Sequence, residues 1–335
     1  MNIHTIRKAI YGVATIAAMA ATPALAQEGT EFFNGKTVNY IVATAPGGGY
    51  DTNARLVAQF MQKYLPGSTF VVQNMPGAGH LIGTNYVYAS EPDGLTFGTF
   101  NTGLIYGQLA GDPAVKFDLG NMSWVGKVAS DPRVLVVTTE SGIESYEQLA
   151  ASKEPVKFAS AGVGSASTVE TTMLVKALGL PVEIISGYNG SDDQLAMRRG
   201  EVQGIIASRS SFQQFVDEGH AKIIAQIGGS ETDVPQLSAL VGDKPEAQKV
   251  IALVASQSNI SRLTAGPPGI PTDRLQALRD AYTKSTSDPE FLEKAKSLGL
   301  PIDPKVGDDV ANVVKAALDQ SPEIVAILKE TMKSE

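Results

Sequence analysis

The 335-residue chain contains no cysteine and only three histidines, His4, His80 and His220. The lack of cysteine excludes disulfide bonds, thiol nucleophiles and cysteine-ligated metals. The two histidines that follow the first 26 residues are too few for a zinc or iron centre of the usual kind. No phosphate-loop lysine follows a glycine-rich turn either. The sequence therefore predicts a protein without metal ions or organic cofactors.

The chain also lacks an apolar run long enough to span a bilayer. The apolar run at 9–21 has about 13 residues, whereas a spanning helix needs about 20. The basic residues Arg7 and Lys8 precede it, and Ala24-Leu25-Ala26 follows it. This order is typical of a secretory signal with an Ala-x-Ala cleavage site, and the short run disfavours a retained anchor. Residues 1–26 are therefore predicted to be a signal peptide.

Positive charge is scarce. The formal net charge is −8, and removal of Arg7 and Lys8 with the signal peptide makes the mature chain more acidic still. Without a basic patch, binding to nucleic acid or to anionic lipid has no electrostatic basis. An acidic surface does not exclude an anionic ligand, because backbone dipoles in a cleft act locally while distant charge is screened.

Apolar, β-branched runs alternate with segments of helical periodicity, which predicts an α/β fold of sheets wrapped by helices. Strands are expected at 38–43, 70–73, 95–99, 134–139, 156–159, 182–185, 204–207 and 223–227. Helices are expected at 52–64, 145–151, 168–178, 191–199 and 211–218, and near the C-terminus at 272–285, 289–297 and 306–332. No internal repeat of fixed period is evident.

Two stretches, 124–133 and 255–266, are interpreted as crossings between lobes. They divide the mature chain into a first lobe at 27–130, a second lobe at 131–255, and a return to the first lobe at 256–335. Two α/β lobes joined by short crossings enclose a cleft, which is a favoured place for a small ligand.

A glycine-rich turn lies between the strand expected at 38–43 and the helix expected from Thr52. It reads Ala45-Pro46-Gly47-Gly48-Gly49-Tyr50-Asp51. Glycine allows backbone conformations closed to other residues, and the first N–H groups of a helix carry partial positive charge. The turn is therefore a candidate cradle for a carboxylate or phosphate, with a plain tight turn as the alternative.

Two further loops have the same character. Gly77-Ala78-Gly79-His80 follows the strand expected at 70–73, and Gly162-Val163-Gly164-Ser165 precedes Ser167 and Thr168 at a helix start. Three hydroxyls beside two glycines favour ligand contact, although helix capping alone would explain one of them. These loops could grip one small anion together.

Several motifs, in this order, resemble the solute-binding proteins of tripartite tricarboxylate transporters, the Bug family. They are Pro46-Gly47-Gly48-Gly49-Tyr50-Asp51, Val72-Gln73-Asn74-Met75-Pro76-Gly77-Ala78-Gly79, Pro92-Asp93-Gly94-Leu95-Thr96, 158–165, Arg199-Gly200-Glu201-Val202 and 265–271. The resemblance covers nearly the whole mature chain.

The resemblance implies a two-lobed periplasmic binding protein of type II-like fold. Such a protein closes around a carboxylate-bearing solute and delivers it to membrane permease subunits, and we expect it to be a monomer. The implied ligand contacts are Ala45, Pro46, Gly47, Gly48, Tyr50, Asp51, Gly77, Ala78, Gly79, His80, Val163, Gly164, Ser165, Ser167, Thr168, Tyr188, Asn189, Ser208 and Arg209.

Three of these positions depart from the family pattern, at Tyr188-Asn189-Gly190, at Ser208-Arg209-Ser210 and at His80, which replaces a frequent glycine. Arg209 is interpreted as an anchor for one carboxylate, with a surface arginine paired to a nearby aspartate as the alternative. His80 is either a ligand contact or an exposed loop residue. Asp51 suits a helix start better than an anchor, because it would repel an anion.

Two other function classes compete with a receptor. An enzyme is disfavoured, because the chain has no Gly-x-Ser-x-Gly elbow, nucleotide-binding loop or complete dinucleotide fingerprint. A sensing or scaffold module that presents the closed form to a partner protein would use the same fold. The ligand's identity stays open among aliphatic di- and tricarboxylates, aromatic acids and amino acids.

Export gives the first testable prediction. We expect cleavage after Ala26, so that material from the periplasm begins at Gln27 in mass spectrometry. Recovery of a chain that still carries Met1, or recovery only with membranes, would contradict the predicted signal peptide.

Overall fold

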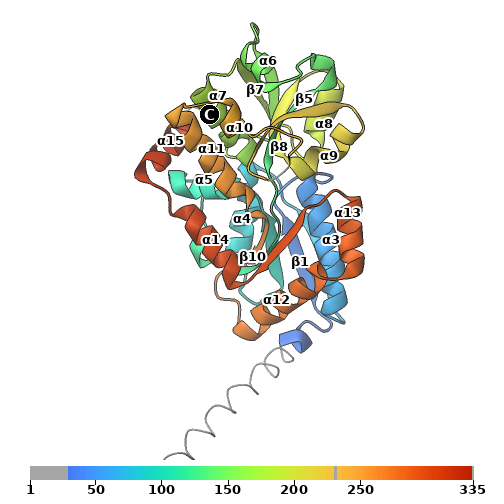
Figure 1. Cartoon of the computed structure of the whole chain (residues 1–335). Coiled ribbons are helices and arrows are strands. Elements are labelled where there is room, and N and C mark those ends of the chain that lie inside the picture. Colours follow the sequence, from blue (N-terminus) through green and yellow to red (C-terminus); the bar gives the residue numbers. More distant parts are fainter. Residues whose placement is uncertain (1–28, 230–231, 334–335) are drawn as a thin grey trace, which may run out of the picture.

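The computed structural model describes residues 29–229 and 232–333, so the predicted signal peptide lies outside the described residues. Two sheets form two lobes, one above the other in Figure 1. The two-lobed α/β architecture expected from the sequence is present. Within the described ranges, no helix is both long and apolar enough to cross a membrane.

The first lobe is built on a six-stranded sheet in the order β11-β4-β10-β3-β1-β2. Its strands are β1 (Thr37–Val42), β2 (Thr69–Asn74), β3 (Thr96–Phe100), β4 (Ser123–Ala129), β10 (Ser261–Gly266) and β11 (Ile302–Val306). β1 pairs in parallel with β2 and β3, whereas β10 is antiparallel to both β3 and β4.

The second lobe is built on a five-stranded sheet in the order β7-β6-β8-β5-β9. Its strands are β5 (Arg133–Thr138), β6 (Val156–Ser160), β7 (Val182–Ser186), β8 (Gly204–Ser208) and β9 (Ala221–Ile227). β6 is parallel to β7 and β8, and β5 is antiparallel to β8 and β9. Every residue of β5 is buried, as expected for a mainly apolar interior strand of a covered sheet.

Helices cover both sheets. In the first lobe they are α3 (Gly49–Tyr64), α4 (Leu81–Tyr88), α5 (Gly103–Ala110), α12 (Thr272–Thr286), α13 (Pro289–Ser297) and α14 (Asp308–Leu318). In the second lobe they are α6 (Tyr146–Ala150), α7 (Ala166–Leu178), α8 (Asp192–Arg198), α9 (Arg209–Asp217), α10 (Leu237–Leu240) and α11 (Pro245–Ser258). The last helix, α15 (Pro322–Lys333), contacts α5, α7 and α11.

The order β2-β1-β3-β10-β4 in the first sheet matches β7-β6-β8-β5-β9 in the second, and β11 extends the first sheet by one strand. In each sheet, a strand that follows a lobe crossing is inserted antiparallel beside three parallel strands: β5 in the second lobe and β10 in the first. The first crossing runs through Ser130, Asp131 and Pro132 between β4 and β5. The second passes from α11 to β10 through Asn259 and Ile260.

Some expected boundaries were wrong. Crossings were expected at 124–133 and 255–266, but 124–129 belongs to β4 and 261–266 forms β10, so each crossing is only two or three residues long. The single helix expected at 306–332 is instead the end of β11 followed by α14 and α15. The break falls before Pro322, since proline lacks the N–H that a continuing helix requires. The division at 27–130, 131–255 and 256–335 stays a prediction, because α15 packs on helices of both segments.

Candidate functional site

A cavity of about 270 Å³ lies between the lobes, where the first glycine loop faces the loop after β7. It is lined by Thr44, Gly47, Gly48, Gly49, Tyr50, Thr52, His80, Asn101, Arg133, Ala161, Ser167, Tyr188, Asn189, Gly190, Ser191, Asp193, Gln194, Ile205, Ala207, Ser208, Ser210, Ser211, Phe212, Gln214, Leu298 and Leu300. Residues from both lobes therefore enclose one space.

The lobes touch on either side of this cavity. A Cβ atom added to Gly48 would lie 3.0 Å from the Cα of Gly190, and one added to Gly79 would lie 2.5 Å from the carbonyl oxygen of Val163. Glycine at these positions allows the backbones to approach closely. The two lobes are therefore in contact beside the cavity.

The first glycine loop is held in shape by Asp51. This carboxylate accepts hydrogen bonds from the Gly47 N–H at 3.0 Å, from Asn74 Nδ2 at 2.9 Å and from Arg55 Nε at 3.0 Å. Burial by itself would raise the pKa of Asp51, but these hydrogen bonds hold it below its ordinary value. Asp51 lies in the first turn of α3 and does not line the cavity. It shapes the loop, in line with a helix-start role.

Helix α3 begins at Gly49, three residues before the expected start at Thr52. Gly48 is therefore the N-cap of α3, and Gly49 is its first residue. Because the first N–H groups of a helix have no partner within it, α3 presents donors and partial positive charge beside Gly48 and Tyr50, which line the cavity.

The second glycine loop contributes His80. Its side chain is buried, its Nδ1 lies 2.9 Å from the Ala43 carbonyl oxygen, and its φ is 79°. The alternative of an exposed loop residue is wrong. Burial lowers the pKa of His80, so the ring is neutral near pH 7. Gly77, Ala78 and Gly79 do not line the cavity; Gly79 instead packs against the third loop.

The hydroxyls of the third loop mainly organise the loop. Ser165 caps α7 by accepting a hydrogen bond from the Thr168 N–H at 3.3 Å. Ser167 Oγ accepts one from the Ala161 N–H at 3.0 Å, and Thr168 Oγ1 donates to the Gly162 carbonyl at 2.6 Å. Of the three, only Ser167 lines the cavity.

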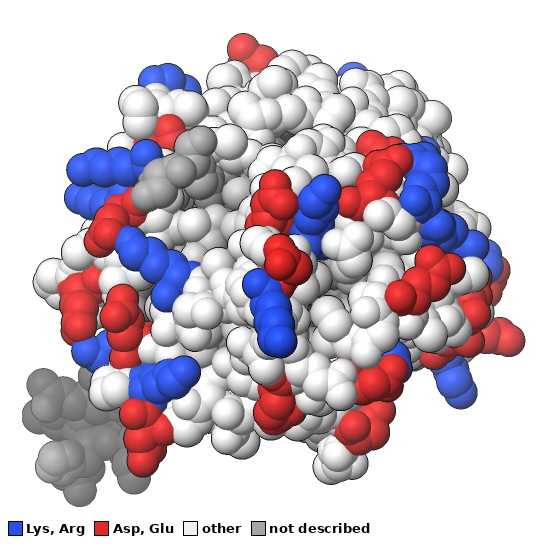
Figure 2. All heavy atoms as spheres, turned by 90° about the horizontal axis from the view of Figure 1, so that it is seen from above, with Lys and Arg blue, Asp and Glu red and all other residues white. Residues whose placement is uncertain are grey.

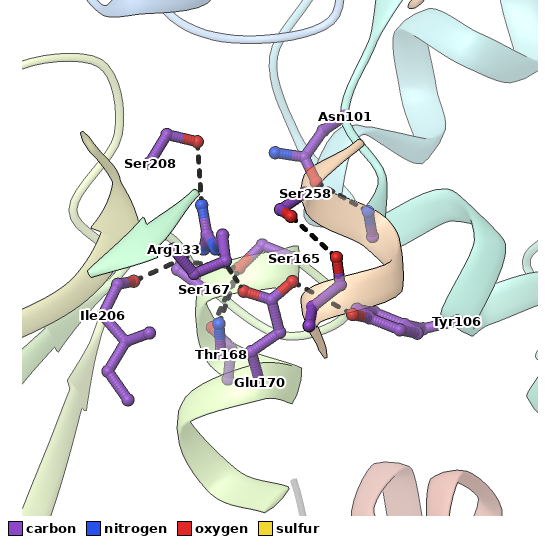
Figure 3. A network of polar contacts seen from close by, with 12 residues as sticks. Asn101, Tyr106, Arg133, Ser165, Ser167, Thr168, Glu170, Ile206, Ser208 and Ser258 are labelled. Carbon is purple, nitrogen blue, oxygen red and sulfur yellow. Dashed lines mark hydrogen bonds and ion pairs between the residues drawn. The ribbon is translucent and has the colours of Figure 1, made fainter. Parts of the chain in front are cut away.

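Several lining residues were missed by sequence reasoning, Asp193 and Asn101 among them, and the most consequential is Arg133, the first residue of β5. Arg133 Nε lies 2.5 Å from Glu170 Oε2, and Nη1 donates to Ser208 Oγ at 2.9 Å. On the far side of Glu170, the Tyr106 hydroxyl of α5 donates to Oε1 at 3.1 Å (Figure 3). Burial raises the pKa of Glu170, and Arg133 and Tyr106 oppose that rise. One feature of the sequence could have indicated it: Arg133 is a single charged residue between Pro132 and the apolar run of a buried strand.

The predicted residues divide into two groups. Those that line the cavity are Gly47, Gly48, Tyr50, His80, Ser167, Tyr188, Asn189 and Ser208. Those that do not are Ala45, Pro46, Asp51, Gly77, Ala78, Gly79, Val163, Gly164, Ser165, Thr168 and Arg209.

Arg209 lines a different and larger cavity of about 800 Å³ beside the crossings, with Lys296 and Gln213 among its other lining residues. There it donates to Gln213 Oε1 at 3.1 Å and lies 3.7 Å from Asp233 Oδ2. The charged lining of the interlobe cavity thus consists of Arg133 and Asp193, and Arg133 is neutralised by Glu170.

Asp193 is partly buried, and the Gln194 N–H donates to its Oδ1 at 2.7 Å. Burial, reinforced by Asp192, raises the pKa of Asp193 to about 7. Within 29–229 and 232–333, no cluster of three or more His, Asp or Glu side chains could hold a metal ion.

Outside the cavity, charges of both signs are interspersed, as on the face shown in Figure 2. Exposed pairs such as Arg198–Glu218 and Arg199–Glu201 neutralise one another locally. Such exposed pairs add little stability each, whereas breaking the buried Arg133–Glu170 pair at the cavity would leave an uncompensated charge.

The buried pair gives a stability prediction. Glu170→Gln leaves the Arg133 charge without its counterion in a buried place, which we expect to lower the free energy of unfolding by about 3 to 5 kcal/mol. Glu201→Gln, which removes an exposed partner of Arg199, should lower the free energy of unfolding far less, because exposed pairs add little stability. Chemical denaturation measures both. Equal losses in the two variants would mean that the buried pair has no special weight.

Comparisons with known proteins agree with this architecture. A model described as "Tripartite tricarboxylate transporter family receptor" matches residues 53–331. The UPF0065 protein in the tcbD-tcbE intergenic region of Pseudomonas sp. (strain P51) is 28% identical over 332 residues, which cover 95% of this chain and 93% of that protein.

Solved structures share the fold. The periplasmic binding protein BugD superposes with a TM-score of 0.74 at 23% identity, covering 88% of this chain and 97% of BugD. MatC from Rhodopseudomonas palustris with bound malate has a TM-score of 0.72 at 20% identity, covering 89% and 99%. The resemblance inferred from the glycine loops is confirmed, and the chain belongs to the tripartite tricarboxylate transporter receptor family.

Proposed function

We propose that this protein is a periplasmic receptor that binds a small carboxylate-bearing solute in the interlobe cavity and delivers it to the permease subunits of a tripartite transporter. The observation that carries the proposal is the enclosure of one cavity by the N-terminus of α3 and by Arg133. Both are suited to a carboxylate, the first through N–H dipoles and the second through its guanidinium.

The Arg133 guanidinium has N–H donors that are not engaged by other residues that the structure describes. Nε and Nη1 are engaged by Glu170 and Ser208, and Nη2 makes a long contact of 3.4 Å to the Ile206 carbonyl. A guanidinium carries five N–H donors, so two remain for a ligand. Because Glu170 compensates its charge, Arg133 would orient a carboxylate by hydrogen bonding more than attract it by net charge.

The volume and the charged lining of the interlobe cavity limit the class of ligand that it can bind. A cavity of about 270 Å³ is smaller than the roughly 300 to 1,000 Å³ of sites for drug-sized molecules. Among the residues that the structure describes, no lysine and no second arginine line it, and Asp193 adds negative charge. These features favour a compact mono- or dicarboxylate over a trianion. Malate in MatC is a ligand of this kind.

The receptor proposal is tested by titration with malate and a panel of small mono- and dicarboxylates. A receptor gains thermal stability by mass action, about 2.7 kcal/mol at a hundredfold excess over Kd, whereas a scaffold does not respond. Absence of any shift across the panel would favour the scaffold. Turnover of a bound acid would point to an enzyme.

Substitutions at Arg133 and at Arg209 distinguish which of the two arginines binds the carboxylate of the ligand. Arg133→Lys keeps the positive charge beside Glu170 but removes the two-pronged donor, so affinity for the acid should fall about ten- to a hundredfold. Arg209→Ala is the matched control, because Arg209 lines the other cavity, and it should bind as the wild type does. Isothermal titration measures both. The reverse pattern would restore Arg209 as the anchor.

Asp193 gives a pH prediction. Below its pKa of about 7 the carboxyl is neutral, and above that it is ionised and repels an anionic ligand. Affinity should therefore fall as pH rises from 6 to 8, by at most about tenfold per unit. Burial lowers the pKa of His80, so its neutral form is favoured as pH rises over this range.

Asp193→Asn should remove this pH dependence while it keeps binding at pH 6. The raised pKa of Asp193 also affects the free energy of unfolding. The contribution of this carboxyl is fully present below about pH 4 and is lost as pH rises through 7, because the native state holds the proton to higher pH than the unfolded chain does. A pH profile of affinity that is identical in wild type and variant would contradict the assignment.

A further inference from the structure

A second arginine, Arg262 in β10, is fully buried behind the cavity wall and does not line the cavity. Its φ of 59° lies in the left-handed region, where residues other than glycine are uncommon. Strained backbone of this kind is retained where the surroundings hold it in place, often at functional sites. The contacts of the Arg262 side chain explain what holds this backbone conformation in place.

Arg262 joins parts of both lobes. Its Nη2 lies 2.9 Å from Ser210 Oγ and 3.3 Å from Ser211 Oγ, at the start of α9 in the second lobe. Its Cζ lies 4.1 Å from the ring centroid of Tyr50, in α3 of the first lobe. Tyr50, Ser210 and Ser211 all line the cavity. One guanidinium therefore contacts the cavity wall from both sides of the cleft.

The same side chain is anchored to the crossing. Nη2 lies 3.5 Å from Oδ2 of Asp131, which is buried. Asp131 in turn accepts hydrogen bonds from the N–H of Ser210 at 3.1 Å and from its hydroxyl at 2.5 Å. The Asp131 N–H donates to the Ser258 carbonyl at 2.8 Å, beside the second crossing. Both crossings and both lobes meet in this cluster.

The packing around Arg262 leaves no room for change. A Cβ atom on Gly49 would lie 2.8 Å from Arg262 Nη2 and 2.7 Å from Ser211 Oγ. Within the part of the chain that the structure describes, Nε and Nη1 of Arg262 are buried and have no hydrogen-bond partner. The guanidinium is thus kept here by its Nη2 contacts and by stacking on Tyr50, since a buried donor without a partner disfavours this placement.

We propose that Arg262 is a positioning residue that sets the closed geometry of the cavity by holding Tyr50 of the first lobe against Ser210 and Ser211 of the second. Ligand affinity then depends on Arg262 although the residue does not touch the ligand. The role in affinity rests on the proposed function, whereas the role in lobe geometry does not.

The test variant is Arg262→Gly, because glycine adopts a φ of 59° without strain, so the side chain is removed without adding backbone strain. Arg262→Lys keeps the charge but not the planar fork. The matched control is Arg274→Ala, since Arg274 also stacks on an aromatic ring, 3.6 Å from Phe32, and donates to the Asp93 carbonyl at 3.0 Å within the first lobe.

Lobe geometry is measured by spin labels. The chain has no cysteine, so Tyr86→Cys and Leu195→Cys, at exposed positions of α4 and α8, give one labelled pair across the cleft. In the ligand-free protein, Arg262→Gly should lengthen and broaden the interlobe distance distribution, and Arg262→Lys should do so to a smaller degree. Malate affinity should fall at least tenfold in Arg262→Gly and remain unchanged in Arg274→Ala.

Wild-type distances in both Arg262 variants would overturn the proposal, as would an equal change in Arg274→Ala. If Arg262→Gly does not fold, the distance distribution of Arg262→Lys decides alone. If no acid in the panel binds the wild type, the proposed function fails, while the ligand-free distances still confirm or overturn the positioning role.

Discussion

The ion pair between Arg133 and Glu170 is the interaction on which the interlobe cavity depends. Both side chains are buried, and removal of either partner would leave an uncompensated charge. Glu170 also accepts from Tyr106 of α5, so the pair connects the start of β5 with α7 and with a helix of the first lobe. The guanidinium is therefore fixed in place before a ligand arrives, which lowers the cost of ordering on binding.

The sheet topology places the Arg133 guanidinium at the interlobe cavity. In each sheet, the strand that follows a crossing is inserted antiparallel beside the three parallel strands. Arg133 is the first residue of one such strand and Arg262 the second residue of the other. Each is paired with a buried carboxylate, Glu170 or Asp131, and contacts the cavity wall or its lining. The two crossings thus bring two compensated guanidiniums to the site while adding no net charge.

Local patterns predicted much of the fold and part of the site. The strands at 134–139 and 204–207 were visible because apolar, β-branched runs are long and bounded, and the glycine loop at 46–51 was visible because three glycines interrupt a strand-to-helix turn. Arg133 and Arg262 were not visible, because their role arises from burial against partners far away in the sequence. Arg209 was chosen for its place beside an expected strand end, but it lies at the start of α9 and lines the other cavity.

The most direct test of the account is a titration of the ¹⁵N-labelled protein with malate, followed by amide and arginine Nε chemical shifts. The account predicts saturable shifts that are largest at Gly48 and Gly49 and at Arg133 Nε, since the N–H groups at the start of α3 and the remaining Nη donors of this guanidinium border the interlobe cavity. Shifts confined to Arg209, Lys296 and their neighbours around the larger cavity, with none at the glycine loop, would contradict it.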